Sequence, residues 1–207
     1  FDIPGLEEHA FFLFNWEGTY QLKKHIEEQF QAFSQQPTGK LNLVIGGTGF
    51  TGTEFIHELK KGIPALCQKY KVVPNDVQII VIEPNQEVLQ GYPDSIVRDA
   101  VTSFNEIGCE FKIGVPVAKV EKEKVILEDG MEILTNTFIW AGGVQGNPVL
   151  EGLGFELLDG RVKLNEYCDV PGNHDVYVLG DTSVSFNEKG EPYPPTAQIA
   201  IQHGQYC

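Results

Sequence analysis

A glycine-rich turn between an apolar strand and a helix constrains the fold of this chain more than any other feature. The apolar run Leu43–Ile45 leads directly into Gly47, Gly49 and Gly52, which have the spacing Gly-x-Gly-x-x-Gly. In dinucleotide-binding folds the first glycine permits the tight turn, the second lets the backbone approach a pyrophosphate, and the third lets helix and strand pack closely. The start of the helix offers free N–H groups to the phosphates. The cofactor-binding residues predicted in this turn are Gly47, Thr48, Gly49, Phe50, Thr51 and Gly52.

The residue that ends the next strand predicts which dinucleotide is bound. The apolar run Val77–Ile82 ends in Glu83, and an acid at this position accepts hydrogen bonds from the ribose hydroxyls. It would repel a 2′-phosphate, and no Arg lies in residues 84–86, so we predict NAD(H) over NADP(H). The alternative for Glu83 is a surface carboxylate that caps the strand. Because Glu83 follows Gly52 by 31 residues, more than the roughly 20 expected, we assign the excess to an insertion around residues 60–75.

Periodicity along the rest of the chain predicts the other elements. Apolar spacing predicts helices over residues 16–33 and 93–107, the second closed by Gly108, and places Trp16, Phe30 and Phe33 in the core. Strands are expected over residues 111–113 and 137–140, with an antiparallel meander between residues 115 and 134. Residues 1–13 read as irregular and residues 34–40 as a linker. The fold class is α/β, with a Rossmann-like three-layer domain over residues 40–145 that contains a parallel sheet and the meander.

A second strand followed by glycine and an acid lies near the end of the chain. The apolar run Val176–Leu179 leads into Gly180 and Asp181. Ligands of open α/β sheets bind at the carboxyl ends of strands, where the glycine permits close approach and the carboxylate can accept a hydrogen bond from a hydroxyl. The alternative for Asp181 is a capping role in the following turn. A final helix is expected over residues 197–207.

Composition restricts the class of partner. The net charge of −14 argues against nucleic acid and against electrostatic binding to anionic lipid. No apolar run approaches the ~20 residues that span a bilayer. The four cysteines show neither Cys-x-x-Cys nor metal-ligand spacing, and neither do the five histidines, so we predict no metal site and a reduced cytosolic setting. Since the chain begins at Phe1 and its only methionine is Met131, we expect a fragment of a longer protein.

Three segments together resemble the type II NADH dehydrogenases (NADH:quinone oxidoreductases) of the FAD- and NAD-linked pyridine nucleotide-disulfide oxidoreductase superfamily. The strand ending in Gly180 and Asp181 resembles the second flavin-binding signature of these flavoproteins. Residues Ile139–Gly143 resemble the Ala-x-Gly crossover that lies beside the NAD. Residues Pro194–Gln202 resemble a segment of the quinone-reducing enzymes. The resemblance covers essentially the whole chain.

The resemblance implies cofactors and residue roles. In the intact enzyme, hydride would pass from NADH to FAD, and electrons would pass on to a quinone. Glu54 would lie near the nicotinamide and flavin and Gln198 in the flavin and quinone pocket, as the two catalytic residues; Glu54 could instead be an acid favoured by the helix dipole. The remaining roles implied are contact with NADH for Ala141, Gly142 and Gly143, with FAD for Gly180, Asp181 and Ala197, and with the quinone for Ile201.

The resemblance also implies how the chain is divided. Residues 1–39 would be an N-terminal flank from the FAD-domain region, residues 40–145 the NAD(H)-binding domain, and residues 146–207 the C-terminal portion of the FAD domain. The family's first flavin domain and its membrane-docking elements do not occur in this sequence, so we expect NADH binding, weak or absent flavin, and no activity in the fragment itself. The intact enzyme would be cytoplasmic and peripheral on the cytoplasmic face of the membrane, with a homodimer as a further option.

Two other functions stay open at this point. One is a different FAD/NAD-linked reductase, acting on a disulfide, a sulfide or a ferredoxin. The segment Pro194–Gln198 favours the quinone enzyme over these. The other is a non-catalytic NAD(H)-binding module, for which the Gly180–Asp181 strand and the final helix would be superfluous.

Overall fold

The computed structural model describes residues 2–13, 15–143 and 145–207. The chain forms two compact units, Phe1–Gly143 and Val144–Cys207. Phe1, with which the predicted irregular segment begins, lies outside the described residues. Each unit is considered by itself.

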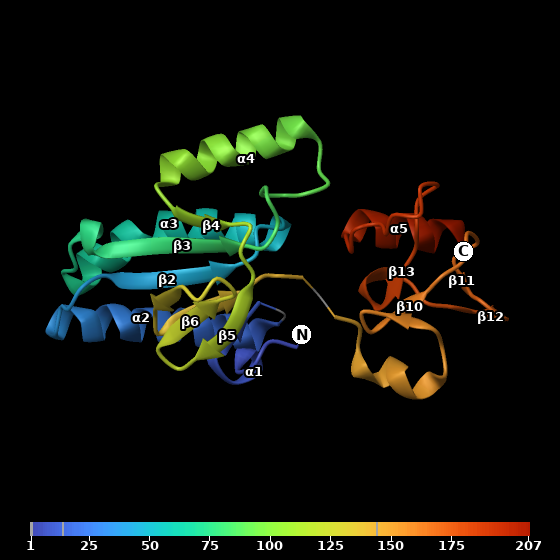
Figure 1. The fold of residues 1–207 in the computed structure, drawn as a ribbon, viewed down its shortest axis with the longest axis horizontal. Helices are drawn as coiled ribbons and strands as arrows, with labels where there is room; N and C mark the ends of the chain where they lie inside the picture. Colours follow the sequence, from blue (N-terminus) through green and yellow to red (C-terminus); the bar gives the residue numbers. More distant parts are fainter. Residues whose placement is uncertain (1, 14, 144) are drawn as a thin grey trace. The chain divides into compact units, whose positions relative to one another are not determined.

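A five-stranded parallel sheet forms the centre of the first unit (Figure 1). Strands β2 and β3 pair in register from Leu41 opposite Val77 to Gly46 opposite Ile82, and β8 pairs with the other side of β2. Because the strands are parallel, the segments that follow β2, β3 and β8 emerge at one edge of the sheet. In spatial order the strands are β1 (Ala10–Phe12), β8 (Thr137–Trp140), β2 (Leu41–Gly46), β3 (Val77–Glu83) and β4 (Glu110–Ile113).

Alternating side chains of the sheet enter two separate hydrophobic cores. Leu43 and Ile45 of β2 pack with the helices on one face, whereas Val44 packs with the antiparallel meander on the other. Figure 1 shows meander strands β5 and β6 in front of the sheet. The predicted three-layer α/β arrangement is confirmed. The covering elements are α2 (Trp16–Gln35), α3 (Phe50–Tyr70) and α4 (Asp94–Ile107) on the helical face, and α1 (Leu6–His9), β5 (Val117–Glu121), β6 (Lys124–Leu127) and β7 (Glu132–Leu134) on the other.

Helix α3 occupies most of the predicted insertion around residues 60–75. The helix continues to Tyr70, with exposed Pro64 inside it, and a short 3₁₀ turn η1 (Pro74–Asp76) then leads into β3. Its buried face carries Ile56, Leu59, Ile63 and Cys67, at intervals of three and four residues. This apolar stripe outweighs the local cost of Gly62 and Pro64 within the helix. The extra spacing between Gly52 and Glu83 is therefore helical length.

The N-terminal segment also differs from its prediction as an irregular stretch. Strand β1 pairs in parallel with β8, from Ala10 opposite Phe138 to Phe12 opposite Trp140, and so extends the sheet. Its three residues are too short to give a readable alternation. The predicted helix over residues 16–33 is confirmed, but the prediction that Trp16 lies in the core is wrong. Trp16 is 77% exposed and stacks on Tyr20, because it begins the helix before the buried positions that start at Leu22.

The second unit has a small core and little regular structure. Its main apolar cluster contains the buried residues Leu150, Val162, Leu164, Cys168 and Val170, and Val184 is buried as well. The predicted strand over residues 176–179 is shifted, because β12 pairs with β11 only as far as Tyr177. The elements are η2 (Pro148–Leu153), β9 (Leu157–Leu158), β10 (Arg161–Lys163), β11 (Asp169–Val170), β12 (Asn173–Tyr177), η3 (Gly180–Thr182), β13 (Ser183–Val184) and α5 (Ala197–Tyr206).

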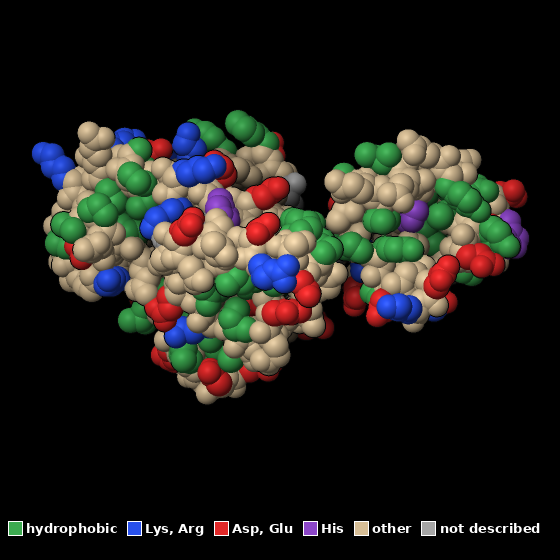
Figure 2. Space-filling view, turned by 90° about the horizontal axis from the view of Figure 1, so that it is seen from above, with side chains coloured by type: hydrophobic (Ala, Val, Ile, Leu, Met, Phe, Trp, Pro, Cys, Tyr) green, Lys and Arg blue, Asp and Glu red, His purple; other side chains and the backbone are tan. Residues whose placement is uncertain are grey.

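The surfaces of the two units differ in character. On the face shown in Figure 2, acidic and basic side chains are interspersed over the first unit. The second unit exposes many large apolar side chains for its size, a feature that marks interaction surfaces. Those more than half exposed are Val149, Leu153, Tyr167, Tyr177, Ile201 and Tyr206. In the part of the chain that the structure describes, no helix has both the length and the apolar character needed to cross a membrane.

Candidate dinucleotide site

The turn after β2 is closely packed at two of its three glycines. Gly47 has a φ of +104°, and its N–H donates to the Ile82 carbonyl oxygen at 2.8 Å. A Cβ on Gly47 would lie 2.6 Å from the Ala141 carbonyl oxygen, and one on Gly52 would lie 2.1 Å from the Gly47 carbonyl oxygen. Both positions therefore require glycine for reasons of backbone geometry and helix–strand packing.

The middle glycine faces open space. A Cβ on Gly49 would meet no atom within 4 Å. Gly49 is the N-cap residue of α3 and provides no side-chain cap, and the first helical turn carries no acid. The first N–H groups of a helix have no intrahelical partner and, with the helix dipole, favour an anion. The space beside Gly49 is thus suited to a phosphate group.

Glu83 lies beneath this turn at the end of β3. It is 4% exposed and Thr48 is fully buried. Glu83 Oε2 accepts hydrogen bonds from the Thr48 N–H at 2.9 Å and from the Thr48 hydroxyl at 2.6 Å. Glu83 Oε1 accepts from the Asn85 N–H at 3.0 Å and from the Asn85 side-chain amide at 2.7 Å. Glu83, which we expected to bind the ribose, therefore accepts hydrogen bonds from the glycine-rich turn.

The segment after β8 lies directly against the turn. The Ala141 N–H donates to the Gly46 carbonyl oxygen at 2.7 Å, which places this crossover beside Gly47. Gly142 lies against the Trp140 ring, where a Cβ would be 2.4 Å from the nearest ring atom. Gly143, with a φ of +111°, borders open space. The structure thus brings together the predicted residues of the turn, Glu83 and the crossover at one sheet edge.

Phe50 and Tyr92 form an aromatic pair beside the turn. Phe50, the first residue of α3, is 44% exposed, and its ring centroid lies 4.5 Å from that of Tyr92 in an edge-to-face arrangement. Burial raises the pKa of Tyr92 above its usual value. Sequence reasoning missed both Tyr92 and Asn85, because their segment after β3 carries no motif. Thr51 and Glu54 lie on exposed positions of the first turns of α3.

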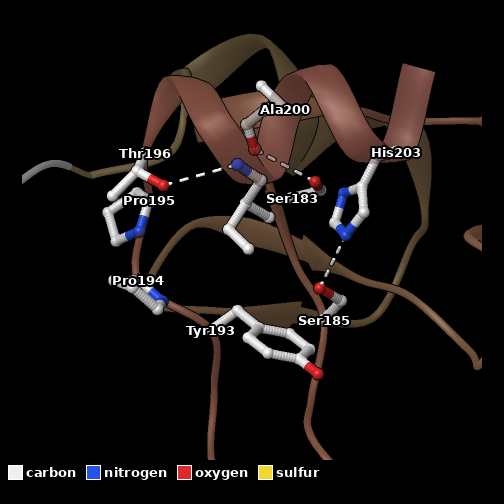
Figure 3. Close-up of a pocket in the computed structure, with 10 residues that line it drawn as sticks. Ser183, Ser185, Tyr193, Pro194, Pro195, Thr196, Ala200 and His203 are labelled. Carbon is white, nitrogen blue, oxygen red and sulfur yellow. Dashed lines mark hydrogen bonds between the residues drawn. The ribbon is translucent and has the colours of Figure 1, made fainter. Parts of the chain in front are cut away.

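The predicted flavin and quinone residues lie in the second unit. Gly180 has a φ of +74°, and a Cβ there would lie 3.5 Å from the Ala200 Cβ, so η3 packs closely against α5. The Thr196 hydroxyl caps α5 by accepting a hydrogen bond from the Ile199 N–H at 3.4 Å (Figure 3). The exposed predicted residues of this unit are Asp181, Ala197, Gln198 and Ile201.

A small pocket separates α5 from the strand and loop below it, as Figure 3 shows. Its lining includes Gly180, Tyr193, Pro194 and Ala200. At one end, His203 Nε2 lies 3.1 Å from the Ser185 hydroxyl oxygen. The Pro194 segment and α5, which resemble the quinone enzymes, thus face each other across this pocket.

A buried cation lies in the neighbouring strand β10. Arg161 is 9% exposed, and its Nε has no hydrogen-bond partner among the described residues. Strand β10 contacts η3, and Val162 pairs with Ser183. A buried N–H without a partner is costly, so this Nε is suited to a hydrogen-bond acceptor.

Metal and thiol chemistry find little support in the described residues. Among them, no group of three His, Cys, Asp or Glu side chains could hold a metal ion. The four cysteines are free. Burial raises the pKa of the Cys109 thiol to about 11, an effect that Lys60 only partly offsets, and burial also raises the pKa of Cys67. A thiol with a raised pKa is a poor nucleophile at neutral pH.

The parallel sheet, its meander and the glycine-rich turn define a Rossmann-like α/β protein. The chain belongs to the pyridine nucleotide-disulphide oxidoreductase family, whose model matches residues 1–204.

Type II NADH:quinone oxidoreductases are among its similar proteins. The enzyme of Staphylococcus saprophyticus is 36% identical over 214 residues, which cover 100% of this chain and 53% of that protein. The Staphylococcus aureus enzyme is 34% identical over 99% of this chain and 53% of its own length. The chain therefore spans about half the length of the curated relatives it matches.

Solved structures share the fold. NDH2 from Plasmodium falciparum in complex with NADH has a TM-score of 0.77 and 18% identity, covering 88% of this chain and 41% of that chain. At this identity the likeness establishes the α/β fold alone.

Proposed function

We propose that this chain is the NADH-binding portion of a flavin-dependent NADH dehydrogenase, which passes hydride from NADH to FAD and electrons to a quinone. The open space at Gly49, beside the uncapped start of α3, is the observation that carries the proposal. The N–H groups at the start of the helix, together with this open space, would hold a diphosphate. The similarity to the staphylococcal NADH:quinone oxidoreductases supports the choice of activity.

The proposed roles follow the geometry of the first unit. The turn residues Gly47 to Gly52 would hold the NADH pyrophosphate, and Glu83 would accept hydrogen bonds from the adenosine ribose. Ala141, Gly142 and Gly143 would border the bound NADH. Glu54, exposed on α3, would lie near the nicotinamide.

The residues of the second unit fit a flavin. Gly180, with its positive φ, packs against α5 and leads into Asp181, whose exposed carboxylate would accept a hydrogen bond from a ribityl hydroxyl. The orphaned Nε of Arg161 is suited to a hydrogen-bond acceptor. When bound, FAD supplies the two-electron chemistry between nicotinamide and quinone. Ala197 and Gln198 would lie near the flavin and quinone, with Ile201 facing the quinone.

The domain roles and cellular setting are proposed on the same basis. Residues 40–145 would be the NAD(H)-binding domain, residues 1–39 an N-terminal flank whose strand β1 extends the sheet of that domain, and residues 146–207 the C-terminal portion of the FAD domain. The intact enzyme would be cytoplasmic and would attach peripherally to the cytoplasmic face of the membrane, with a homodimer as one arrangement.

Titration of the 207-residue chain with NADH tests the proposal directly. Calorimetry should detect binding to the wild-type chain and none to Gly49→Val, because the new side chain fills the space of the diphosphate. Circular dichroism of Gly49→Val should match the wild type, since a Cβ there meets no atom within 4 Å. Absence of binding by the wild-type chain, or undiminished binding by Gly49→Val, would remove the glycine-rich turn from the site.

The choice among reductases needs the full-length protein. NADH oxidation should depend on a quinone and should fail with oxidised glutathione, oxidised lipoamide or oxidised ferredoxin as the electron acceptor. Activity with a disulfide instead would favour the related reductases, and NADH binding without any turnover would favour a non-catalytic module.

A further inference from the structure

The carboxylate of Glu83 has all of its acceptor positions in use. A carboxylate offers about four lone-pair positions, and Glu83 accepts four hydrogen bonds, two at each oxygen. A ribose hydroxyl that donates to Glu83 must therefore displace one of these four donors. The identity of the displaced donor then contributes to the affinity for NADH.

The two donors on Oε2 are the harder ones to displace. Thr48 is fully buried, so its hydroxyl would lose a charge-assisted hydrogen bond with no water to replace it. Its backbone is held on both sides, because the Gly47 N–H donates to the Ile82 carbonyl oxygen and the Thr53 hydroxyl donates to the Thr48 carbonyl oxygen at 3.2 Å. The bonds from Thr48 to Oε2 thus fix the glycine-rich turn over the end of β3.

One donor on Oε1 is easy to displace. The Asn85 N–H is fixed, because the Gly114 N–H donates to the carbonyl oxygens of both Glu83 and Asn85, at 2.8 and 3.0 Å. The Asn85 side chain is on an exposed residue, so its amide can rotate into water and keep its hydrogen bonds there. Oε1 is therefore the oxygen that can exchange a protein donor for a ligand hydroxyl.

We propose that Glu83 divides its carboxylate between two tasks, and that Asn85 limits the affinity for NADH. Oε2 anchors the glycine-rich turn through Thr48, while Oε1 binds the adenosine ribose hydroxyl after the Asn85 amide has moved away. Thr48 is a positioning residue, and Asn85 is a competitor for the ribose. This inference rests on the proposed binding of NADH.

Calorimetric titration of the 207-residue chain with NADH and with ADP-ribose tests the competitor. ADP-ribose contains the adenosine ribose and diphosphate but lacks the nicotinamide. Asn85→Ala removes the competing amide and leaves the backbone N–H, so its Kd for both ligands should fall by about threefold to tenfold, the worth of one exchanged hydrogen bond. Gln90→Ala, an exposed change in the same segment, is the matched control and should leave Kd unchanged.

The anchor is tested with two variants at Thr48. Thr48→Val keeps the side-chain volume but loses the hydroxyl, and its Kd should rise by about tenfold or more. Thr48→Ser keeps the hydroxyl, so its Kd for both ligands should equal that of the wild type. If Thr48 acted only through its side-chain volume, Thr48→Val would bind better than Thr48→Ser. Amide hydrogen exchange in the ligand-free chain gives a second reading, because protection of the turn should fall in Thr48→Val and persist in Thr48→Ser.

The outcomes separate this inference from the proposed function. If the wild-type chain binds neither NADH nor ADP-ribose, the proposed function fails and the inference fails with it. If the wild type binds both ligands but Asn85→Ala binds them equally or more weakly, only the competitor role is overturned. Equal binding by Thr48→Val and the wild type would overturn the anchor.

Discussion

At the scale of single residues, the three glycines of the turn divide between fold and ligand. Gly52→Ala should lower the free energy of unfolding of the first unit by about 2–4 kcal/mol, because its Cβ would overlap the Gly47 carbonyl oxygen. Gly62→Ala in α3 is the matched control, since a Cβ there meets no atom within 4 Å and alanine favours a helix by about 1 kcal/mol. Urea titration followed by circular dichroism measures the free energy of unfolding of both variants. Equal effects of the two changes would contradict the packing role of Gly52.

The thiols provide a pH-dependent prediction at the same scale. Because burial raises the pKa of Cys109 to about 11, only about one molecule in a thousand carries its thiolate at pH 8. Iodoacetamide at pH 8 should therefore modify exposed Cys207 and spare Cys109, and the labelling rate of Cys109 should rise about tenfold from pH 8 to pH 9. Mass spectrometry of peptides locates the label. Labelling of Cys109 as fast as Cys207 at pH 8 would contradict the raised pKa.

At the scale of elements, helices α2 and α3 are joined by a polar contact as well as by their core. Glu27 of α2 accepts hydrogen bonds from Lys69 at 2.5 Å and from Tyr70 at 2.9 Å, both in α3. The Lys69 hydrogen bond is the main reason that the pKa of Glu27 lies below its usual value.

The sign of the pH effect follows from that lowered pKa. A carboxyl whose pKa is lower in the folded state stabilises the fold above its unfolded value of about 4.5, and the contribution is lost as pH falls through the folded pKa. Glu27→Gln should lower the Tm by less than about 2 °C at pH 7, since the pair is largely solvated, and the difference should be smaller at pH 3. Thermal unfolding at the two pH values measures this. A larger difference at pH 3 than at pH 7 would reverse the assigned sign.

Elements also differ in how far the sequence could predict them. Strands β2 and β3 were predictable because buried parallel strands appear in a sequence as continuous apolar runs. The turn was predictable because its backbone geometry requires glycine at Gly47 and Gly52. Strand β1 was not, since its three residues become a strand only by pairing with β8, which is 125 residues or more away in sequence. Asn85 was not either, because its role depends on contact with Glu83 and on exposure, neither of which has a local pattern.

At the scale of the whole molecule, the two compact units have very different cores. The first contains two large clusters of buried side chains on the two faces of its sheet, whereas the described part of the second contains one small cluster of buried apolar residues. Hydrophobic stabilisation grows with the apolar area buried, so a unit with so small a core is marginal. The exposed apolar side chains of the second unit, including Ile201 and Tyr206, add no stability to it.

The two units should therefore unfold separately. Scanning calorimetry should show two unfolding transitions, with residues 144–207 unfolding at the lower temperature. Hydrogen exchange should assign each transition to its unit, because the amides of β2 and β3 should exchange more slowly than those of β10 and β13. A ligand stabilises only the unit that binds it, and NADH at 100 times its Kd contributes about 2.7 kcal/mol. Saturating NADH should raise the midpoint temperature of the upper transition and leave that of the lower transition unchanged. A shift of the lower transition alone would move the NADH site out of the first unit, and a single transition would show that the units unfold together.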